Sequence, residues 1–156
     1  MVKYINTGIP WDNPDCQITF NPVSVNNTPN GHKIFNNLLK TTHKNVFTEY
    51  LDYIQDENPK RLLGDIQLVK LKDQQRFILN GYVYQKGKLD YLALSKTFVE
   101  LFNIAEEYKL DVAIPLQMGS SNPFTKAQVQ VIIDTVFFDF RQTAYIYNKI
   151  PSKIKK

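Results

Sequence analysis

The sequence predicts a three-layer α/β/α fold with a mixed central sheet, and three observations support this class. Short β-compatible runs alternate with segments of helical period over most of the chain. The 156 residues, of which 43% are hydrophobic, suffice for one domain with a proper core. We find no repeat, no low-complexity stretch and no internal linker. We therefore expect helices on both faces of a single sheet.

The net charge of +4 is concentrated at one end of the chain. Four lysines lie in the last eight residues, and the other 148 residues carry 15 basic and 15 acidic side chains, which sum to zero. The charge pattern predicts a domain at residues 1–148 followed by a basic tail at 149–156. Nucleic acid is a disfavoured partner because it normally requires a basic face on the folded body.

Several features favour a cytoplasmic protein without a membrane partner. No apolar run approaches the ~20 residues of a membrane span, and the start MVKYINTG lacks a signal-peptide core. Cys16 is the only cysteine, so no internal disulfide can form. Richness in Lys, Asn, Ile and Tyr fits a phage or a low-GC bacterium, and a phage protein would act in the host cytoplasm.

The first half of the chain begins with short strands and continues with helices. We expect strands at residues 2–6 and 18–20, with the second strand ended by Asn21–Pro22. Residues 7–17 and 23–31 are rich in turn formers and are predicted loops. A helix begins near His32, and a second helical stripe over residues 46–54 ends at Asn58–Pro59.

The second half alternates strands and helices. Residues 62–71 and 76–84 are predicted strands, joined by the polar turn KDQQ and therefore adjacent. Asp90 is placed to cap a long helix at residues 91–108. A buried strand at 111–116, a helix at 124–140 and a last strand at 143–147 complete the prediction.

Motifs for common enzyme chemistry are missing from the sequence. Cys16 has no sequence cue for a partner base, and two histidines with one cysteine lack any metal-ligand spacing. There is no P-loop and no dinucleotide fingerprint. We therefore expect no metal and no cofactor.

Two polar loops are the candidate ligand site, because ligands of such folds sit at the carboxyl ends of the strands. Amides, hydroxyls and a free helix N-terminus suit ribose, base edges and anions, although the same residues are ordinary in turns and caps. The first loop supplies Asn21, Ser24, Asn26, Asn30, Gly31 and His32. The second supplies Gly119, Ser120, Ser121, Asn122 and Phe124. Asp12, paired with Asp15, could accept a hydrogen bond from a sugar hydroxyl or an adenine amino group.

Several segments resemble the macrodomain family, in particular small stand-alone members of the ADP-ribose-1″-phosphate phosphatase type. The similar segments are NVFTEYLDYIQDENPKRLLGDIQLVKL, RFILNGYVYQ, LDYLALSKTFVELFNIAEEYKLDVAIPLQMG and TAYIY, over roughly residues 45–148. The resemblance implies a macrodomain-like fold whose cleft holds ADP-ribose, with the two loops around the distal ribose and diphosphate. Gln85, which ends the second segment, is included in the candidate site on this basis.

The ligand signature of the family is altered in this chain. The family's early Gly-Asp-Ile reads Thr7–Gly8–Ile9, so Asp12 would have to replace its adenine-binding Asp. Ser, Asn and Pro stand where the second loop of the family has glycines, which narrows a phosphate cradle. These changes favour a binding protein for ADP-ribose or a related nucleotide-derived ligand, without efficient catalysis, that could sequester a nucleotide signal for a phage.

Two alternatives remain open from the sequence. The first is a hydrolase of an ADP-ribose derivative, in which Asn21 or Asn26 would position a water molecule and loop amides would stabilise charge. The second is a module with a decayed cleft that acts through a protein partner or as a homo-oligomer.

Overall fold

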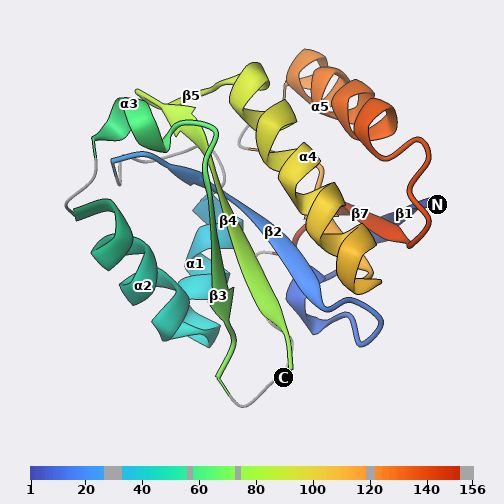
Figure 1. The fold of residues 1–156 in the computed structure, drawn as a ribbon, viewed down its shortest axis with the longest axis horizontal. Helices are drawn as coiled ribbons and strands as arrows, with labels where there is room; N and C mark the ends of the chain where they lie inside the picture. Colours follow the sequence, from blue (N-terminus) through green and yellow to red (C-terminus); the bar gives the residue numbers. More distant parts are fainter. Residues whose placement is uncertain (27–32, 56–57, 73–74, 119–121, 152–156) are drawn as a thin grey trace.

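The computed structural model describes residues 1–26, 33–55, 58–72, 75–118 and 122–151. Within these residues one mixed sheet of seven strands lies between two layers of helices (Figure 1), which confirms the predicted fold class. The strands are β1 (Val2–Thr7), β2 (Ile18–Ser24), β3 (Ile66–Lys70), β4 (Phe77–Gln85), β5 (Lys88–Leu89), β6 (Val112–Pro115) and β7 (Ala144–Lys149). The helices are the 3₁₀ turn η1 (Pro10–Asp12), α1 (Lys33–Thr42), α2 (Lys44–Gln55), α3 (Pro59–Leu62), α4 (Tyr91–Tyr108) and α5 (Pro123–Val136).

The sheet has the strand order β1-β7-β6-β2-β4-β3, with β5 paired to β4. The first five strands in this order are parallel, and β3 and β5 run antiparallel to β4. The predicted adjacency of the two strands on either side of KDQQ is confirmed by the β3–β4 pairing. Because five strands are parallel, their carboxyl ends lie at the same edge of the sheet.

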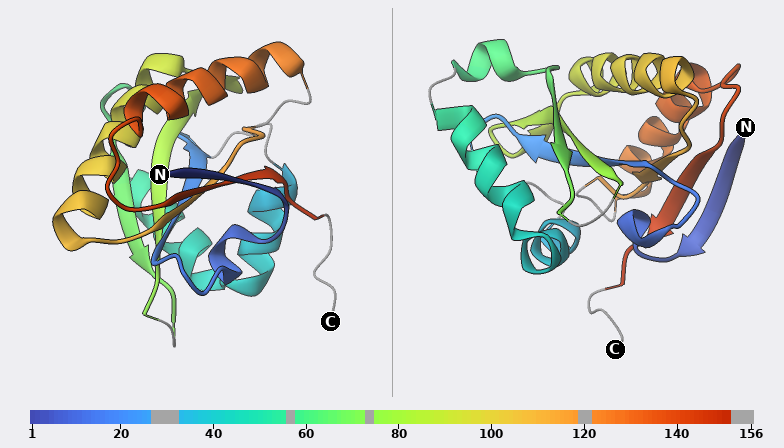
Figure 2. Two further views of the ribbon diagram at one scale, coloured as in Figure 1. Left: turned by 90° about the vertical axis from the view of Figure 1, so that its right-hand side faces the viewer. Right: turned by 60° about the horizontal axis from the view of Figure 1, so that its bottom comes forward.

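Two hydrophobic layers hold the helices against the sheet. Helices α4 and α5 cover one face, and α1 and α2 cover the other (Figure 2, right). The larger core, under α4 and α5, is centred on Phe20, Phe98 and Phe137. Smaller clusters on the other face contain Trp11, with Leu39 of α1, and Tyr82, with Tyr50 of α2. The candidate site lies at the carboxyl edge of the sheet, between these two layers.

Strand β2 continues beyond its predicted end. It runs through Asn21 and Pro22 to Ser24, so these residues belong to a buried strand and not to a loop. Proline normally ends a strand because it lacks an N–H donor. Here β2 is paired with β6 only as far as Thr19, so Pro22 lies beyond this pairing and its missing N–H costs no hydrogen bond to β6.

Other element boundaries also differ from the prediction. Residues 62–65 are not strand: Leu62 ends the short helix α3, whose N-cap Asn58 accepts a hydrogen bond from the Lys60 N–H at 3.0 Å. The predicted loop at residues 7–17 contains η1, and α5 ends at Val136 instead of residue 140. The last strand extends to Lys149. The predicted cap of α4 is confirmed, since Asp90 Oδ1 accepts from the Ala93 N–H at 2.8 Å.

Candidate functional site at the carboxyl edge of the sheet

The sheet is divided at its carboxyl edge between β2 and β6. These strands pair only at Ile18↔Val112 and Thr19↔Ala113, whereas β6 pairs with β7 as far as Pro115 and β2 pairs with β4 as far as Ser24. The chain leaves β2 toward α1 on one face and leaves β6 toward α5 on the other. This is a topological switch point, the place where open α/β sheets bind ligands. We call this division the fork.

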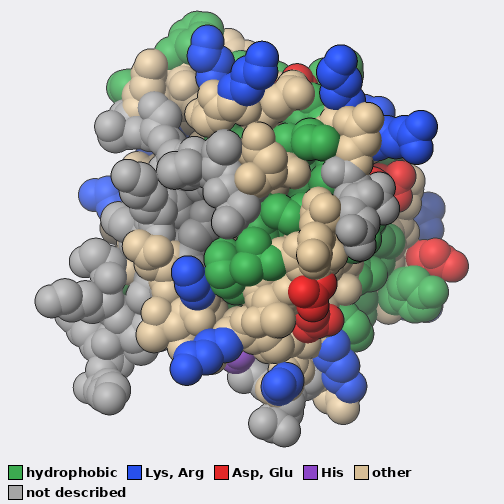
Figure 3. Space-filling model, turned by 90° about the vertical axis from the view of Figure 1, so that its left-hand side faces the viewer, with side chains coloured by type: hydrophobic (Ala, Val, Ile, Leu, Met, Phe, Trp, Pro, Cys, Tyr) green, Lys and Arg blue, Asp and Glu red, His purple; other side chains and the backbone are tan. Residues whose placement is uncertain are grey.

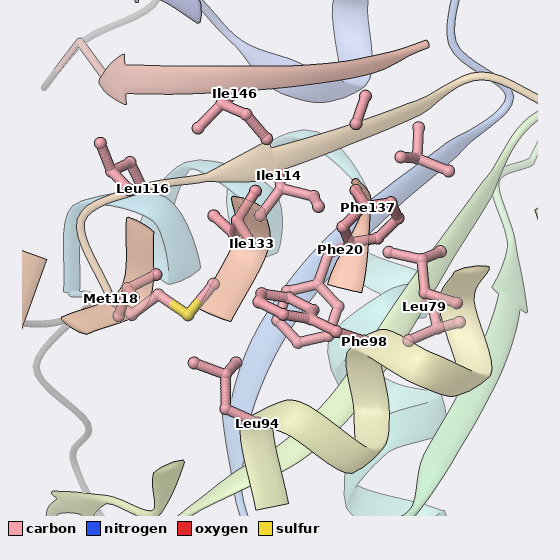
Figure 4. Packing of buried hydrophobic residues seen from close by; sticks show 14 of the residues in the cluster. Phe20, Leu79, Leu94, Phe98, Ile114, Leu116, Met118, Ile133, Phe137 and Ile146 are labelled. Carbon is pink, nitrogen blue, oxygen red and sulfur yellow. The ribbon is translucent and has the colours of Figure 1, made fainter. Parts of the chain in front are cut away.

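Apolar side chains fill the base of the fork on the α4/α5 face. Figure 4 shows Leu116 and Met118 continuing the line of Ile114, with Met118 directed toward Phe98 and Leu94. All of these side chains are buried. The segment after β6 is therefore anchored up to Met118, immediately before the second predicted loop.

A row of amides crosses the opposite face at the same level. Asn21 of β2, Asn80 of β4 and Gln67 of β3 are cross-strand neighbours. Asn21 Nδ2 donates to Asn80 Oδ1 at 2.8 Å, and Asn80 Nδ2 donates to Gln67 Oε1 at 3.1 Å. Gln67 Oε1 also accepts from the Tyr82 hydroxyl, and Gln67 Nε2 donates to the Glu49 carbonyl oxygen of α2. The row fixes the orientation of the Asn21 side chain, whose Nδ2 is engaged and whose Oδ1 is left to accept.

Three buried polar atoms near this edge have no hydrogen-bond partner among the described residues. They are Asn21 Oδ1, the Tyr84 hydroxyl near the end of β4, and Asn148 Oδ1 near the end of β7. A buried polar atom without a partner costs about 1–3 kcal/mol, so each favours a partner that approaches from the carboxyl edge. Burial alone raises the pKa of Tyr84, which keeps its hydroxyl protonated and able to donate.

The end of β2 is held from two sides. The Ser24 hydroxyl donates to Asn26 Oδ1 at 3.1 Å, and the Tyr50 hydroxyl of α2 donates to the Ser24 carbonyl oxygen. The register with β4 shifts between Val23 and Ser24. Ser24 is buried and Asn26 is exposed, so the polar side chain at the surface here is that of Asn26.

The second predicted loop leads into helix α5. Asn122 is its N-cap, with Oδ1 accepting from the Phe124 N–H at 2.9 Å, and Pro123 occupies the first turn. Capping is therefore an observed role of Asn122. Phe124 is 67% exposed beside it, which leaves an aromatic face free. The candidate residues Asn30, Gly31, His32, Gly119, Ser120 and Ser121 lie outside the described residues.

The structure separates the remaining two candidates. Gln85 ends β4 and pairs with Lys88 of β5, at the carboxyl edge. Asp12 ends η1, which is held toward the start of β4 because Arg76 Nη1 donates to the Trp11 carbonyl oxygen at 2.7 Å. Its charge acts on His43, whose pKa is lowered by burial and raised in smaller part by Asp12.

Several lysine side chains are exposed at the carboxyl edge. Lys86 and Lys88 follow β4, and Lys149 ends β7; all three are exposed. Figure 3 shows Lys and Arg side chains gathered at the end of the molecule that carries α3 and β5. This distribution suits an anionic ligand.

Sequence reasoning missed several groups that organise this site. Asn80 and Gln67 were not candidates, and neither were the tyrosines that surround the end of β2. A usable signal existed for Asn80, because an amide in the middle of the apolar run FILNGYVY must find a partner once it is buried. Gln67 became visible only through its register opposite Asn80.

The described residues hold no group of three or more His, Cys, Asp or Glu side chains that could bind a metal ion. In the same residues no helix has the length and apolar character needed to cross a membrane.

The strand order, the two helical layers and the divided carboxyl edge define the macrodomain fold, as the resemblance in sequence predicted. The chain is similar to the macrodomains of DarG from Mycobacterium tuberculosis (TM-score 0.76, 16% identity, covering 96% of this chain and 98% of that chain) and Thermus aquaticus (0.75, 13%, 96% and 99%). A DarTG structure from Thermosipho africanus, determined in complex with ADP-ribose, matches with a TM-score of 0.67 and 13% identity over 92% of this chain and 40% of that chain. No protein-family model and no curated protein matches the sequence.

Proposed function

We propose that this protein binds ADP-ribose or a related nucleotide-derived ligand in the fork between β2 and β6, without efficient turnover. The observation that carries the proposal is the set of three buried polar atoms that lack a partner among the described residues, at the carboxyl edge of a macrodomain fold. The complex of the Thermosipho africanus protein with ADP-ribose supports the choice of ligand. A phage protein of this kind would serve to sequester a nucleotide signal.

Each part of such a ligand has a suitable group nearby. The exposed lysines at the ends of β4 and β7 favour the diphosphate. The side-chain Oδ1 atoms of Asn21 and Asn148 can accept hydrogen bonds from ribose hydroxyls or an adenine amino group. The exposed ring of Phe124 offers a stacking surface for a base or a ribose. The nitrogens of the α5 N-terminus point toward the same edge, where the helix dipole favours an anion.

Binding is favoured over catalysis by the chemistry of the described side chains at this edge. The side chains proposed to contact the ligand are amides, hydroxyls and lysines, and the Asn21 amide is fixed by the Asn80–Gln67 row. A hydrolase would need a group that activates water. The Asn21 side-chain oxygen favours hydrolysis as a second candidate, because it could orient a water molecule in place of a ligand hydroxyl.

Calorimetric titration with ADP-ribose, ADP-ribose-1″-phosphate, NAD and cyclic ADP-ribose, followed by chromatography of each mixture, tests the proposal. We expect saturable binding of at least one ligand and recovery of that ligand unchanged. Product formation would contradict the proposed binding function and support the hydrolase. Absence of binding by all four compounds would contradict both and favour the module with a decayed cleft.

Variants locate the site within the same assay. Asn26→Ala and Phe124→Ala change exposed side chains, so the fold should persist, and each should weaken binding by about tenfold. Tyr108→Ala is the matched control, because Tyr108 is 66% exposed at the far end of α4. Equal affinities in all three variants would place the ligand elsewhere.

A further inference from the structure

Strand β1 leaves one side of the sheet without a partner among the described residues. It pairs with β7 on its inner side and stands last in the strand order. Its six residues, VKYINT, contain no proline, no glycine and no bulge, and Lys3 is the only charged side chain. Natural proteins usually protect such an edge with charges, prolines or bulges, because its free N–H and C=O groups can pair with another strand. This edge has little of that protection.

Exposed apolar side chains on β1, on α5 and just after α5 lie beside the free edge. The Tyr4 hydroxyl donates to Asp134 Oδ1 at 2.8 Å, which fixes α5 against β1 (Figure 2, left). Val131 precedes Asp134 by three residues and shares its side of the helix. Phe138 lies in the turn that follows α5, two residues after the helix ends at Val136. Their exposed fractions are 60% and 88%, and that of Tyr4 is 48%. We call Tyr4, Val131 and Phe138 the edge strip.

We propose that a second copy of this chain pairs with the free edge of β1. The two β1 strands run antiparallel about a two-fold axis near Tyr4 and join two sheets into one. A two-fold axis between antiparallel strands stands perpendicular to the sheet, so both α5 helices lie on the same face. Val131 of each copy then faces Phe138 of the other. Such an isologous contact closes at two copies.

A second copy fits this surface better than an isolated strand from another protein. An added strand would satisfy the backbone of β1, but Val131 on α5 and Phe138 in the turn after it stand one layer above the sheet. A second copy brings its own α5 to that layer. The edge strip exposes on the order of 350 Å² per copy. Two copies would bury roughly 700 Å² of it, to which the paired backbones add, against the about 1,200–2,000 Å² of a stable interface. A reversible dimer is therefore expected.

One contact in this arrangement is unfavourable and provides a sharp test. Asp134 lies beside Tyr4, so the two-fold axis brings the Asp134 carboxylates of both copies toward each other. Replacing the charge with an amide of the same shape should therefore strengthen the dimer. If two copies associated through an apolar patch in another geometry, removing the Asp134 charge would not strengthen the dimer.

Sedimentation equilibrium over a range of protein concentrations tests the proposal. We expect a monomer–dimer equilibrium that Phe138→Glu shifts at least tenfold toward monomer and that Asp134→Asn shifts severalfold toward dimer. Leu92→Glu is the matched control, because Leu92 is also apolar and exposed but lies on α4; it should leave the equilibrium unchanged. Circular dichroism confirms that each variant is folded. A single-chain mass at every concentration would overturn the proposal, and so would larger assemblies or a dimer that ignores Phe138→Glu.

A cysteine on the axis tests the strand pairing itself. Tyr4→Cys should form a disulfide between two chains on mild oxidation, because residue 4 of each copy faces residue 4 of the other. The native Cys16 is buried and does not compete. Tyr108→Cys, equally accessible but away from the axis, should crosslink no faster than random collision allows. Equal crosslinking of the two variants would refute the antiparallel register even if a dimer exists.

Discussion

At the scale of single residues, Gly81 shows how closely Phe20 and helix α4 pack against strand β4. A Cβ atom at this position would lie 2.5 Å from Phe20 Cε2 and 3.3 Å from Thr97 Cβ. Glycine is needed here because the Phe20 ring occupies the space of a side chain. The same ring packs against Phe98 at 4.9 Å between centroids and supports the base of the fork.

Gly81→Ala should therefore destabilise the protein by about 1–3 kcal/mol through overpacking. Urea unfolding measures the change. Adding Phe20→Leu to Gly81→Ala frees space for the new methyl group, so the double variant should lose less stability than the two single changes together. Wild-type stability of Gly81→Ala alone would show that the Phe20 ring moves aside at no cost.

At the scale of elements, helix caps were predictable and strand ends were not. Asp90 was identified from sequence because a short acidic side chain preceded an apolar helical stripe. The end of β2 was missed because Pro22 normally stops a strand, and only the loss of pairing with β6 explains why it does not. Sequence periodicity reports which face of an element is buried, but it does not report which neighbour stands beside it.

Asp90→Ala should destabilise the protein by about 1 kcal/mol, because it removes the hydrogen bond to the Ala93 N–H and a negative charge at the start of α4. The midpoint of urea unfolding should fall with an unchanged slope. Asp90→Asn keeps the capping oxygen and should recover most of the loss. If the two variants are equally unstable, the charge and not the hydrogen bond is what stabilises the helix.

The candidate site was predictable in outline and not in detail, because sequence does not report which elements stand side by side. The sequence placed two polar loops at one edge of the sheet, and the neighbouring positions of β2 and β6 agree with that expectation. It could not show that Asn21 is strand, that Gln67 lies opposite Asn80, or that η1 is held toward the start of β4. Each of these facts depends on contacts between residues far apart in the chain.

At the scale of the whole molecule, Cys16 reports opening of the structure. It is buried against Ala113 of β6 and Tyr147 of β7. Burial, followed by the charges of Asp111 and Asp15, raises the pKa of its thiol to about 12. In the folded protein the thiol therefore stays protonated at neutral pH and is shielded from reagents.

At pH 8 a thiol reagent should label Cys16 of the native protein at least about a hundredfold more slowly than in urea, because the thiolate is the reactive form. The pH dependence of stability has a definite sign. The raised folded pKa means that this group's contribution is full below the unfolded pKa of about 8.5 and declines as pH rises toward 12. Fast native labelling would mean that the segment around Cys16 readily lifts away from β6 and β7.

The shallow pairing of β2 with β6 has a consequence for how ligand preference can change. Two residue pairs join the halves of the sheet, so β2 and β6 are held together only at the base of the fork. The distance between the carboxyl ends of β2 and β6 then depends on the size of the side chains packed at the base of the fork, such as Phe20 and Ile114. Interior substitutions there would widen or narrow the mouth without altering any residue that touches the bound molecule. Surveys of altered selectivity should therefore include these interior positions alongside the loops.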